Sequence, residues 1–268
     1  MCPAMKKSRA DNLLVARGLC QSRSQAQTLI LAGEVWCGER RVEKASDWVF
    51  ETEPIVVRPR AARFVSRGGE KLEHALKVFQ ISVPGKVCLD IGASTGGFTD
   101  CLLKHGAERV FAVDVGYGQL DSSLRKHAKV SVLENTNART LTFSDLEIVH
   151  PSATQITLVV IDVSFISLSK IVLPLSATVR AHDWVMLFKP QFEVGPENVV
   201  RGGVVKSEEA VESALASFHA ELESAGFKRS GMPQTSPLLG KKSGNLELLV
   251  HYVLGDSNGY RRDVVLAL

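Results

Sequence analysis

The stretch from Lys86 to Thr99 constrains the fold of this chain more than any other. It reads KVCLDIGASTGGFT, an apolar run rich in β-branched residues that ends in an acid and a glycine loop. A run such as Val87 to Ile91 can be buried on both faces, as a central parallel strand is. Gly92, Gly96 and Gly97 let the backbone turn sharply and approach a ligand closely. We expect a helix to start near Gly97, with the ligand at its N-terminus.

The residue pattern of this loop limits which ligands it can bind. The loop reads D-x-G-x-x-x-G-G-F-T, which fits neither the dinucleotide pattern G-x-G-x-x-G nor the phosphate loop G-x-x-x-x-G-K-[ST]. Asp114 ends the next predicted strand, at the spacing at which an acid accepts both ribose hydroxyls of a nucleoside. This order of elements predicts an S-adenosylmethionine (SAM) site, as in methyltransferases. On spacing alone, a nicotinamide enzyme remains open.

The remainder of the chain predicts an α/β, doubly wound, Rossmann-like domain over residues 68–268. Apolar positions at helical spacing predict an amphipathic helix from Gly68 to Phe79. Further strands are predicted at 129–133, 156–163 and 184–188, a helix at 207–225, and two terminal strands at 227–232 and 245–253. The alternation of strands and helices indicates a parallel sheet, and the short connection before the last strand indicates a terminal hairpin.

The charge of the chain is unevenly distributed. Residues 1–67 hold twelve Lys and Arg against seven Asp and Glu, whereas the remainder holds twenty against twenty-two. The basic N-terminal part indicates an anionic partner, with a merely solvated surface as the alternative. Five cysteines without a C-x-x-C pair indicate reduced thiols in a cytoplasmic protein. No stretch approaches the ~20 apolar residues that span a bilayer, and we assign neither a membrane partner nor a metal site.

Residues 1–58 predict a small α+β module. Two short helical patterns flank Gly18, and Ser22 and Gly33 are placed to cap and to end the second. A hairpin at 35–42 and strands at 48–50 and 55–57 follow. Residues 59–67 form a basic linker, in which Phe64 is expected to anchor against the next domain.

This module resembles the RNA-binding module first seen in a ribosomal small-subunit protein and shared by pseudouridine synthases and tyrosyl-tRNA synthetases. The matching residues are Arg9-x-Asp11, Leu13-Leu14, Arg17-Gly18, Ser22-Arg23-x-x-Ala26, Ile30, Ala32-Gly33-x-Val35, Gly38 and Val42. The resemblance implies arginines that contact RNA phosphates and shape, which gives affinity and orientation rather than sequence readout. We assign RNA binding to Arg9, Arg17, Arg23, Arg40, Arg41, Arg63 and Arg67.

Four charged residues should meet where the strands of the second domain end, since ligands of such sheets bind outside that edge. Asp162 and Lys189 close two predicted strands, Glu247 lies in the terminal strand, and Lys71 lies on the entering helix. We assign proton removal from a ribose 2′-hydroxyl to Lys189, because burial and a second cation, Lys71, disfavour its ammonium form. Asp162 and Glu247 would orient it. For each residue taken singly, a structural ion pair is the alternative.

Methyltransferases that act on other acceptor groups have different sequence motifs. Enzymes that act on exocyclic amino groups usually carry [DN]-P-P-[YF] after the fourth strand, where this chain reads Asp162-Val-Ser-Phe165. A cysteine nucleophile for carbon methylation is missing at the same place. Amino and carbon methylation are therefore disfavoured, and methylation of a hydroxyl group is the remaining possibility.

Over essentially its whole length the chain resembles the TlyA group of haemolysin-like ribosomal RNA 2′-O-methyltransferases. The shared motifs are Ser66-Arg-Gly-Gly-x-Lys71-Leu, Leu89-Asp-x-Gly-Ala-Ser-Thr-Gly-Gly-Phe-Thr99, Val113-Asp-Val-Gly-Tyr-Gly-Gln-Leu120, Asn135-Thr-Asn-Ala-Arg139, Asp162-x-Ser-Phe-Ile-Ser-Leu168, Leu187-x-Lys-Pro-Gln-Phe-Glu193 and Gly244-Asn-x-Glu247. One departure is Phe64, at a position where we expect tryptophan.

This resemblance implies SAM-dependent methylation of a cytidine 2′-hydroxyl in rRNA, with ribosomal subunits as partners. It also implies a catalytic tetrad of Lys71, Asp162, Lys189 and Glu247. The cofactor site then comprises Asp90, Gly92, Ala93, Ser94, Gly96, Gly97, Phe98, Asp114, Val115, Asn137 and Asp162.

Two alternatives belong to other functional classes. A membrane-active haemolysin would need an exported chain or a membrane-seeking amphipathic segment, and we find neither in the sequence. A non-catalytic RNA-binding ribosome factor is disfavoured by the intact glycine loop, Asp114 and the tetrad. The sequence does not indicate whether the chain self-associates.

Overall fold

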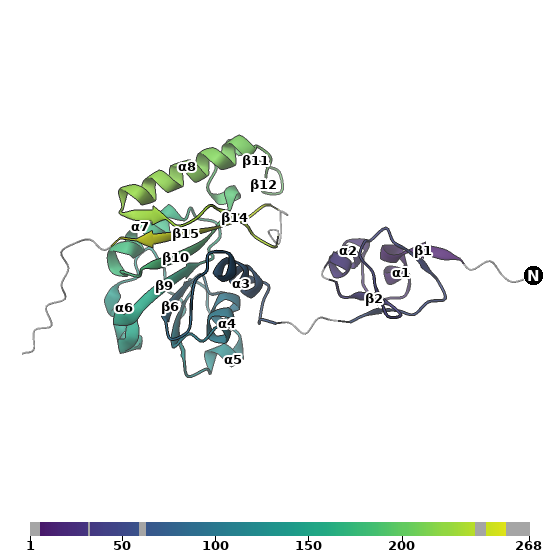
Figure 1. Cartoon of the computed structure of the whole chain (residues 1–268), viewed down its shortest axis with the longest axis horizontal. Helices are drawn as coiled ribbons and strands as arrows, with labels where there is room; N and C mark the ends of the chain where they lie inside the picture. Colours follow the sequence, from purple (N-terminus) through teal and green to yellow (C-terminus); the bar gives the residue numbers. More distant parts are fainter. Residues whose placement is uncertain (1–5, 32, 59–62, 239–244, 256–268) are drawn as a thin grey trace, which may run out of the picture. The chain divides into compact units, whose positions relative to one another are not determined.

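The computed structural model describes residues 6–31, 33–58, 63–238 and 245–255. Contacts within the chain define two units, Met1–Arg63 and Phe64–Leu268 (Figure 1). Some features expected from the sequence lie outside the described residues. They are Cys2, Ala32, positions 59–62 of the linker and Gly244 of the last motif.

The first unit has the α+β architecture expected for it. Its elements are β1 (Lys7–Arg9), α1 (Ala10–Ala16), α2 (Arg23–Leu31), β2 (Val35–Cys37), β3 (Arg40–Arg41), β4 (Trp48–Phe50) and β5 (Ile55–Val57). Strand β2 pairs antiparallel with β3 and with β5, and β1 pairs antiparallel with β4. Strand β1 was not anticipated, because its sequence KSR has no apolar alternation.

Local signals set the second helix of this unit as expected. The Ser22 hydroxyl oxygen accepts a hydrogen bond from the Gln25 N–H at 3.2 Å, and Gly33 has a φ of +70° just beyond the helix. The helices bury Leu14, Ala26 and Ile30 against residues of the strands. The predicted cap and stop are both confirmed.

The second unit is built on an eight-stranded sheet. Its strands are β6 (Val87–Ile91), β7 (Arg109–Val113), β8 (Val130–Leu133), β9 (Ile156–Ile161), β10 (Asp183–Phe188), β13 (Phe227–Arg229), β14 (Gln234–Thr235) and β15 (Leu248–Leu254). Their order is β13-β15-β10-β9-β6-β7-β8, with β14 paired to β15. Neighbours from β8 to β10 run parallel, whereas β15 is antiparallel to both β10 and β13. The predicted parallel sheet with a terminal hairpin is confirmed.

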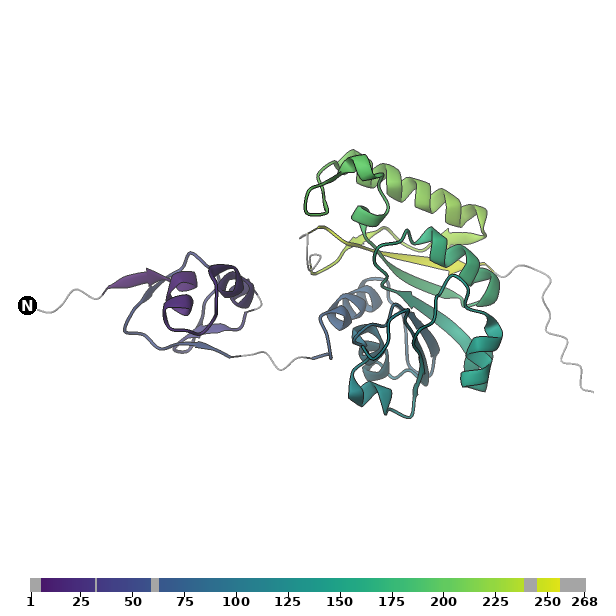
Figure 2. The same cartoon turned by 180° about the vertical axis from the view of Figure 1, so that it is seen from behind.

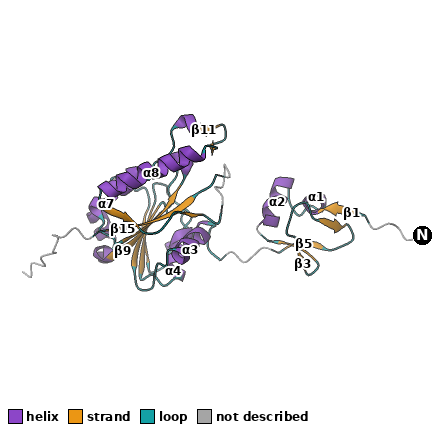
Figure 3. Ribbon diagram, turned by 45° about the horizontal axis from the view of Figure 1, so that its top comes forward, coloured by secondary structure: helices purple, strands orange, loops and turns teal. Residues whose placement is uncertain are grey.

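Helices cover both faces of this sheet, with the strands between them (Figures 1, 2 and 3). They are α3 (Gly68–Val78), α4 (Gly97–Lys104), α5 (Ser122–Arg125), α6 (Phe143–Val149), α7 (Ser169–Thr178) and α8 (Glu208–Ser224). Helices α3 and α4 share one buried cluster with the sheet, and α6, α7 and α8 share the other. The short hairpin of β11 (Val199–Val200) and β12 (Val204–Val205) precedes α8. Because β6 is sandwiched between these layers, all five of its residues are buried.

Phe64 belongs to the core of the second unit. Its side chain is 4% exposed and packs in the cluster of α3 and α4. A Cβ atom added at Gly69 would lie less than 3.0 Å from the Phe64 ring, so the glycine makes room for that ring. Phe64 is therefore the hydrophobic anchor that its position in the linker predicted.

Cys20, Cys37, Cys88 and Cys101 are free thiols, and all are buried. Within the described parts of the chain, no helix is both long enough and apolar enough to cross a membrane.

Candidate active site

The loop between β6 and α4 needs glycine for two reasons. Gly92 has a φ of +81° and Gly96 a φ of +95°, a region that side-chain-bearing residues rarely adopt. A Cβ atom at Gly92 would also lie less than 3.0 Å from the carbonyl oxygen of Asp162, and one at Gly96 would overlap Leu124. The loop therefore brings the ends of β6 and β9 together, and α4 starts at Gly97 as expected.

Asp90 is buried directly below this loop. One of its carboxylate oxygens accepts a hydrogen bond from the Thr99 hydroxyl at 2.6 Å, and the other has no hydrogen-bond partner among the described residues. Burial, helped by the carboxylates of Asp162 and Asp114, raises the pKa of Asp90 to about 7, although the hydrogen bonds from Thr99 lower it. A positively charged ligand in the loop would favour its ionised form.

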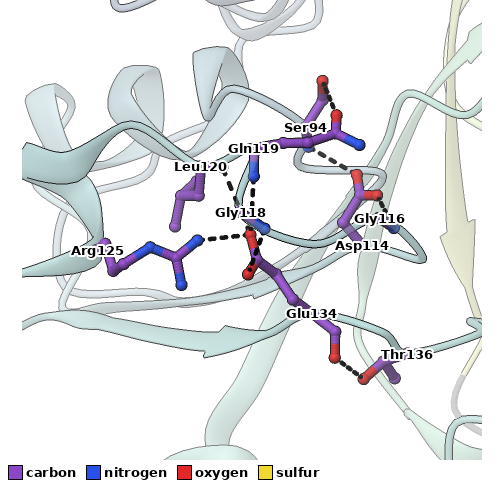
Figure 4. A network of polar contacts seen from close by, with 9 residues as sticks. All are labelled: Ser94, Asp114, Gly116, Gly118, Gln119, Leu120, Arg125, Glu134 and Thr136. Atoms are coloured by element: carbon purple, nitrogen blue, oxygen red, sulfur yellow. Dashed lines mark hydrogen bonds and ion pairs between the residues drawn. The ribbon is translucent and has the colours of Figure 1, made fainter.

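Asp114 anchors the opposite side of the loop. Its oxygens accept hydrogen bonds from the backbone N–H groups of Ser94 and Gly116, both at 2.7 Å (Figure 4). Each carboxylate oxygen has a second lone pair, so Asp114 can still accept ribose hydroxyls. The neighbouring Val115 side chain is 74% exposed, and Asn137, which is also exposed, accepts a hydrogen bond from Arg139 N–H at 3.0 Å.

Glu134 was not anticipated from the sequence, although it organises the segment after Asp114. Its carboxylate accepts hydrogen bonds from the N–H groups of Gly118 at 3.0 Å and Gln119 at 3.2 Å (Figure 4). The Arg125 guanidinium lies 2.6 Å from it, and together with the backbone N–H group of Gly118 it lowers the pKa of Glu134 to about 2. The only sequence signal is its place directly after β8, at the carboxyl edge of the sheet.

These features fit SAM, which combines a nucleoside with a positively charged sulfur and an ammonium group. Gly92 and Gly96 give the loop its tight turn at the end of a buried strand, Asp90 offers a buried acceptor, and Asp114 offers acceptors for a ribose. Ala93 and Phe98, the other residues expected here, are buried, at 7% and 4% exposure.

The four residues expected to form a tetrad lie in two ion pairs at the same edge of the sheet. Lys189 Nζ is 2.6 Å from Asp162 Oδ1, and Lys71 Nζ pairs with Glu247 Oε2. Asp162 follows β9, Lys189 follows β10, and Phe188 is the register partner of Leu248. The register therefore places Lys189 beside Glu247 and brings the two pairs together.

Burial makes this cluster chemically unusual. Lys189 is 8% exposed and Glu247 4%, and the Lys71 side chain is 12% exposed. Lys189 Nζ also donates a hydrogen bond to Ser164 Oγ at 3.0 Å. Two cations and two carboxylates shielded from water interact more strongly than they would at the surface, which suits the transfer of a proton from a weak acid.

The arginines assigned to RNA binding have unequal surroundings. Arg9 and Arg23 both bind the buried carboxylate of Asp11, at 3.0 and 2.9 Å, and hold the pKa of Asp11 well below its usual range. The Arg23 guanidinium therefore also joins α2 to the start of α1, and the Arg9 guanidinium joins the end of β1 to the same residue.

The other five assigned arginines are exposed. Arg17 donates a hydrogen bond to the backbone carbonyl of Glu51, and Arg41 pairs with Glu43 at 2.9 Å. Arg40, Arg63 and Arg67 are exposed as well.

Known proteins resemble the chain over most of its length. The 16S/23S rRNA (cytidine-2′-O)-methyltransferase TlyA of Mycobacterium tuberculosis (strain CDC 1551 / Oshkosh) is 44% identical over 90% of this chain and 88% of that protein. Hemolysin A of Brachyspira hyodysenteriae is 40% identical over 92% of this chain and 100% of that protein. A solved structure of a proposed hemolysin from Streptococcus thermophilus has a TM-score of 0.69 at 37% identity, and covers 95% of this chain and 90% of that chain.

Family comparison divides the chain in the same way as its fold. The FtsJ-like methyltransferase family matches residues 64–251, and the S4 domain matches residues 8–49. Together with the strand order and the glycine loop, these matches define a SAM-dependent methyltransferase joined to an S4 RNA-binding domain. Within that class, the chain belongs to the TlyA family.

Proposed function

We propose that this protein transfers the methyl group of SAM to the 2′-hydroxyl of a cytidine in rRNA, with the small ribosomal subunit, the large subunit or both as substrates. The observation that carries the proposal is the pair of buried ion pairs, Lys189–Asp162 and Lys71–Glu247, at the strand edge that also holds the glycine loop. The name of the M. tuberculosis relative, which specifies cytidine 2′-O-methylation in 16S and 23S rRNA, supports the choice of acceptor.

In this mechanism Lys189 is the base. SAM, when bound, supplies a methyl group on a positively charged sulfur, which a hydroxyl oxygen can attack. Lys189 takes the hydroxyl proton as a neutral amine, and the proton passes to its Nζ atom as the hydroxyl oxygen attacks. Asp162 orients the Lys189 amine, and Glu247 holds Lys71 in place.

The remaining site residues bind the cofactor and the RNA. Asp90, Gly92, Ala93, Ser94, Gly96, Gly97, Phe98, Asp114, Val115, Asn137 and Asp162 would surround SAM. The exposed arginines, among them Arg17, Arg40 and Arg41, would contact rRNA phosphates, and Arg9 and Arg23 would do so from their places beside Asp11. Such a substrate places the protein with ribosomes in the cytoplasm.

Neither alternative function accounts for the site. Lysis of a membrane gives no role to two largely buried lysines, each paired with a carboxylate, or to a glycine turn beside Asp114. A factor that only binds RNA gives no role to Asp162 and Lys189.

The test is methyl transfer from labelled SAM to isolated small and large subunits of a strain that lacks this protein, followed by nucleoside analysis. We expect 2′-O-methylcytidine, and the two incorporations rank the two substrates. Lys189→Ala should lower the rate by at least about 100-fold, the size of a general-base contribution, while the affinity for SAM stays within about twofold. Lys228→Ala, a change at an exposed residue of β13, is the matched control. Methylated bases, or no incorporation by a protein that binds SAM, would contradict the proposal.

A further inference from the structure

The direction of the Lys189 amine is set by one loop. This loop follows β9, and two of its residues, Asp162 and Ser164, contact Lys189 Nζ at 2.6 and 3.0 Å. A neutral amine has two N–H groups and one lone pair. The Ser164 hydroxyl oxygen accepts one N–H group, and the Asp162 carboxylate lies beside the amine as its ion-pair partner. These two contacts together restrict the direction in which the lone pair can point.

The backbone of this loop is strained next to Ser164. Phe165 has a φ of +67°, a conformation that is unfavourable for a residue with a side chain and persists only when its surroundings impose it. The Phe165 ring lies 5.2 Å from the ring of Phe192, which follows Lys189 by three positions. The turn that carries Lys189 therefore supports the loop that carries Ser164.

Glu193 provides a second connection between the same two segments. Its Oε1 accepts a hydrogen bond from the backbone N–H of Leu168 at 2.9 Å, and Ser167 donates a further one. Glu193 is joined rigidly to Lys189, because the Phe192 N–H bonds to the Lys189 carbonyl at 2.9 Å and the Glu193 N–H to the Pro190 carbonyl at 3.0 Å. The two ends of the loop are thus held, one at Lys189 and one at Glu193.

We propose that Ser164 is a positioning residue that aims the amine of Lys189 at the substrate hydroxyl, and that Glu193 holds the loop that presents Ser164. The inference rests on the proposed function, in which Lys189 takes the proton. Ser164 acts only through Lys189, so its loss should slow methyl transfer and leave the binding of both substrates unchanged.

The first test is a series of Ser164 variants measured in single-turnover methyl transfer to rRNA. Ser164→Ala should lower the rate about tenfold, because a displaced reacting group reduces the fraction of productive geometry. The Kd for SAM and the KM for rRNA should stay within about twofold of the wild-type values. Ser164→Thr restores the hydroxyl at an exposed position and should recover the rate to within about threefold.

The matched control is Ser224→Ala, which removes one serine hydroxyl, as Ser164→Ala does. The Ser224 hydroxyl lies at the end of α8 and donates a hydrogen bond to the backbone carbonyl of Ala220. The control variant should leave the rate unchanged. An unchanged rate in Ser164→Ala, or a threonine variant as slow as the alanine variant, would overturn the inference.

The second test is the coupling between Ser164 and Glu193. If both act on Lys189 through one loop, the double alanine variant should lose about as much rate as the slower single variant, whereas independent effects would multiply. Glu193→Gln keeps the acceptor for the Leu168 N–H and should remain within about threefold of wild type. Multiplied losses would exclude the shared loop. If Glu193→Ala does not fold, the Ser164 series alone decides.

The measurements distinguish the loss of the proposed methyl-transfer function from the loss of the role of Ser164 alone. A wild-type protein that transfers no methyl to rRNA removes the proposed function and this inference together. A wild-type protein that transfers methyl, with Ser164→Ala as fast as wild type, removes only the role of Ser164.

Discussion

Asp90 shows how strongly one buried side chain can make the free energy of unfolding depend on pH. It is fully buried at the end of β6, beside two other carboxylates, and burial raises its pKa to about 7. Below about pH 4 its carboxyl is protonated in both the folded and the unfolded chain. Between about pH 4 and pH 7 only the folded chain keeps the proton, so the free energy of unfolding decreases as the pH rises, and above about pH 7 this effect is complete.

Replacing Asp90 by asparagine should remove that contribution. Relative to wild type, the free energy of unfolding of Asp90→Asn should increase by as much as about 4 kcal/mol between pH 4 and pH 8, at about 1.4 kcal/mol for each unit by which the pKa is raised. Urea unfolding of the full chain at several pH values, followed by circular dichroism, measures this difference. The slope is the observable, since the asparagine adds a constant cost of its own. A difference that does not vary with pH would refute a raised pKa for Asp90.

At the scale of elements, the proposed active site depends on the close approach of the chain after β6 to the chain after β9. Gly92 makes that approach possible, because its Cβ-free backbone lies against the carbonyl of Asp162. The same contact connects the cofactor loop to the residue that pairs with Lys189. A disturbance at Gly92 should therefore affect SAM binding and catalysis together.

Gly92→Ala tests this connection. We expect the affinity for SAM to fall by at least about tenfold and the free energy of unfolding to fall by about 1–3 kcal/mol, as for an overpacked core. Gly85→Ala is the matched control, since Gly85 also has a positive φ, +74°, but has nothing within 4 Å of an added Cβ. Gly85→Ala should lower the free energy of unfolding through the strained backbone conformation, but it should leave the affinity for SAM unchanged. Equal SAM affinities in the two variants would show that the close approach at Gly92 does not matter.

At the scale of the whole molecule, the basic charge and the S4 domain coincide. Residues 1–67 carry the excess of Lys and Arg, and the S4 match covers residues 8–49. Binding of rRNA should therefore weaken steeply with salt, because arginines that neutralise phosphates release counterions.

Replacement of Arg17 and Arg40 by glutamine should weaken rRNA binding and reduce the slope of log K against log salt by about one unit for each lost phosphate contact. These two residues are chosen because neither binds Asp11, so the ion pairs of Asp11 with Arg9 and Arg23 are kept. Filter binding at several salt concentrations gives the slope. The control is the double change of Lys228 and Arg229 to glutamine, which removes the same charge from exposed positions of β13. The same slope in both double variants would exclude Arg17 and Arg40 from the RNA contact.

Much of this protein could be predicted from the sequence by itself. The limits of β6, the turn at Gly92 and Gly96, the cap at Ser22 and the left-handed Gly33 all depend on neighbouring residues, and the structure confirms them. The four charged residues of the proposed active site could be named because three of them stand at or next to the ends of strands, and ligands bind at that edge of a parallel sheet.

Only the tertiary structure decided which of these residues are partners. Lys71 meets Glu247 across 176 positions of the chain, and Glu134 and Glu193 bind backbone N–H groups of distant segments. Arg9 and Arg23, which the sequence alone assigned to RNA, both bind the buried Asp11. The physical reason is that local patterns depend on residues a few positions apart, whereas such contacts depend on strand order and register, which arise when the whole core packs.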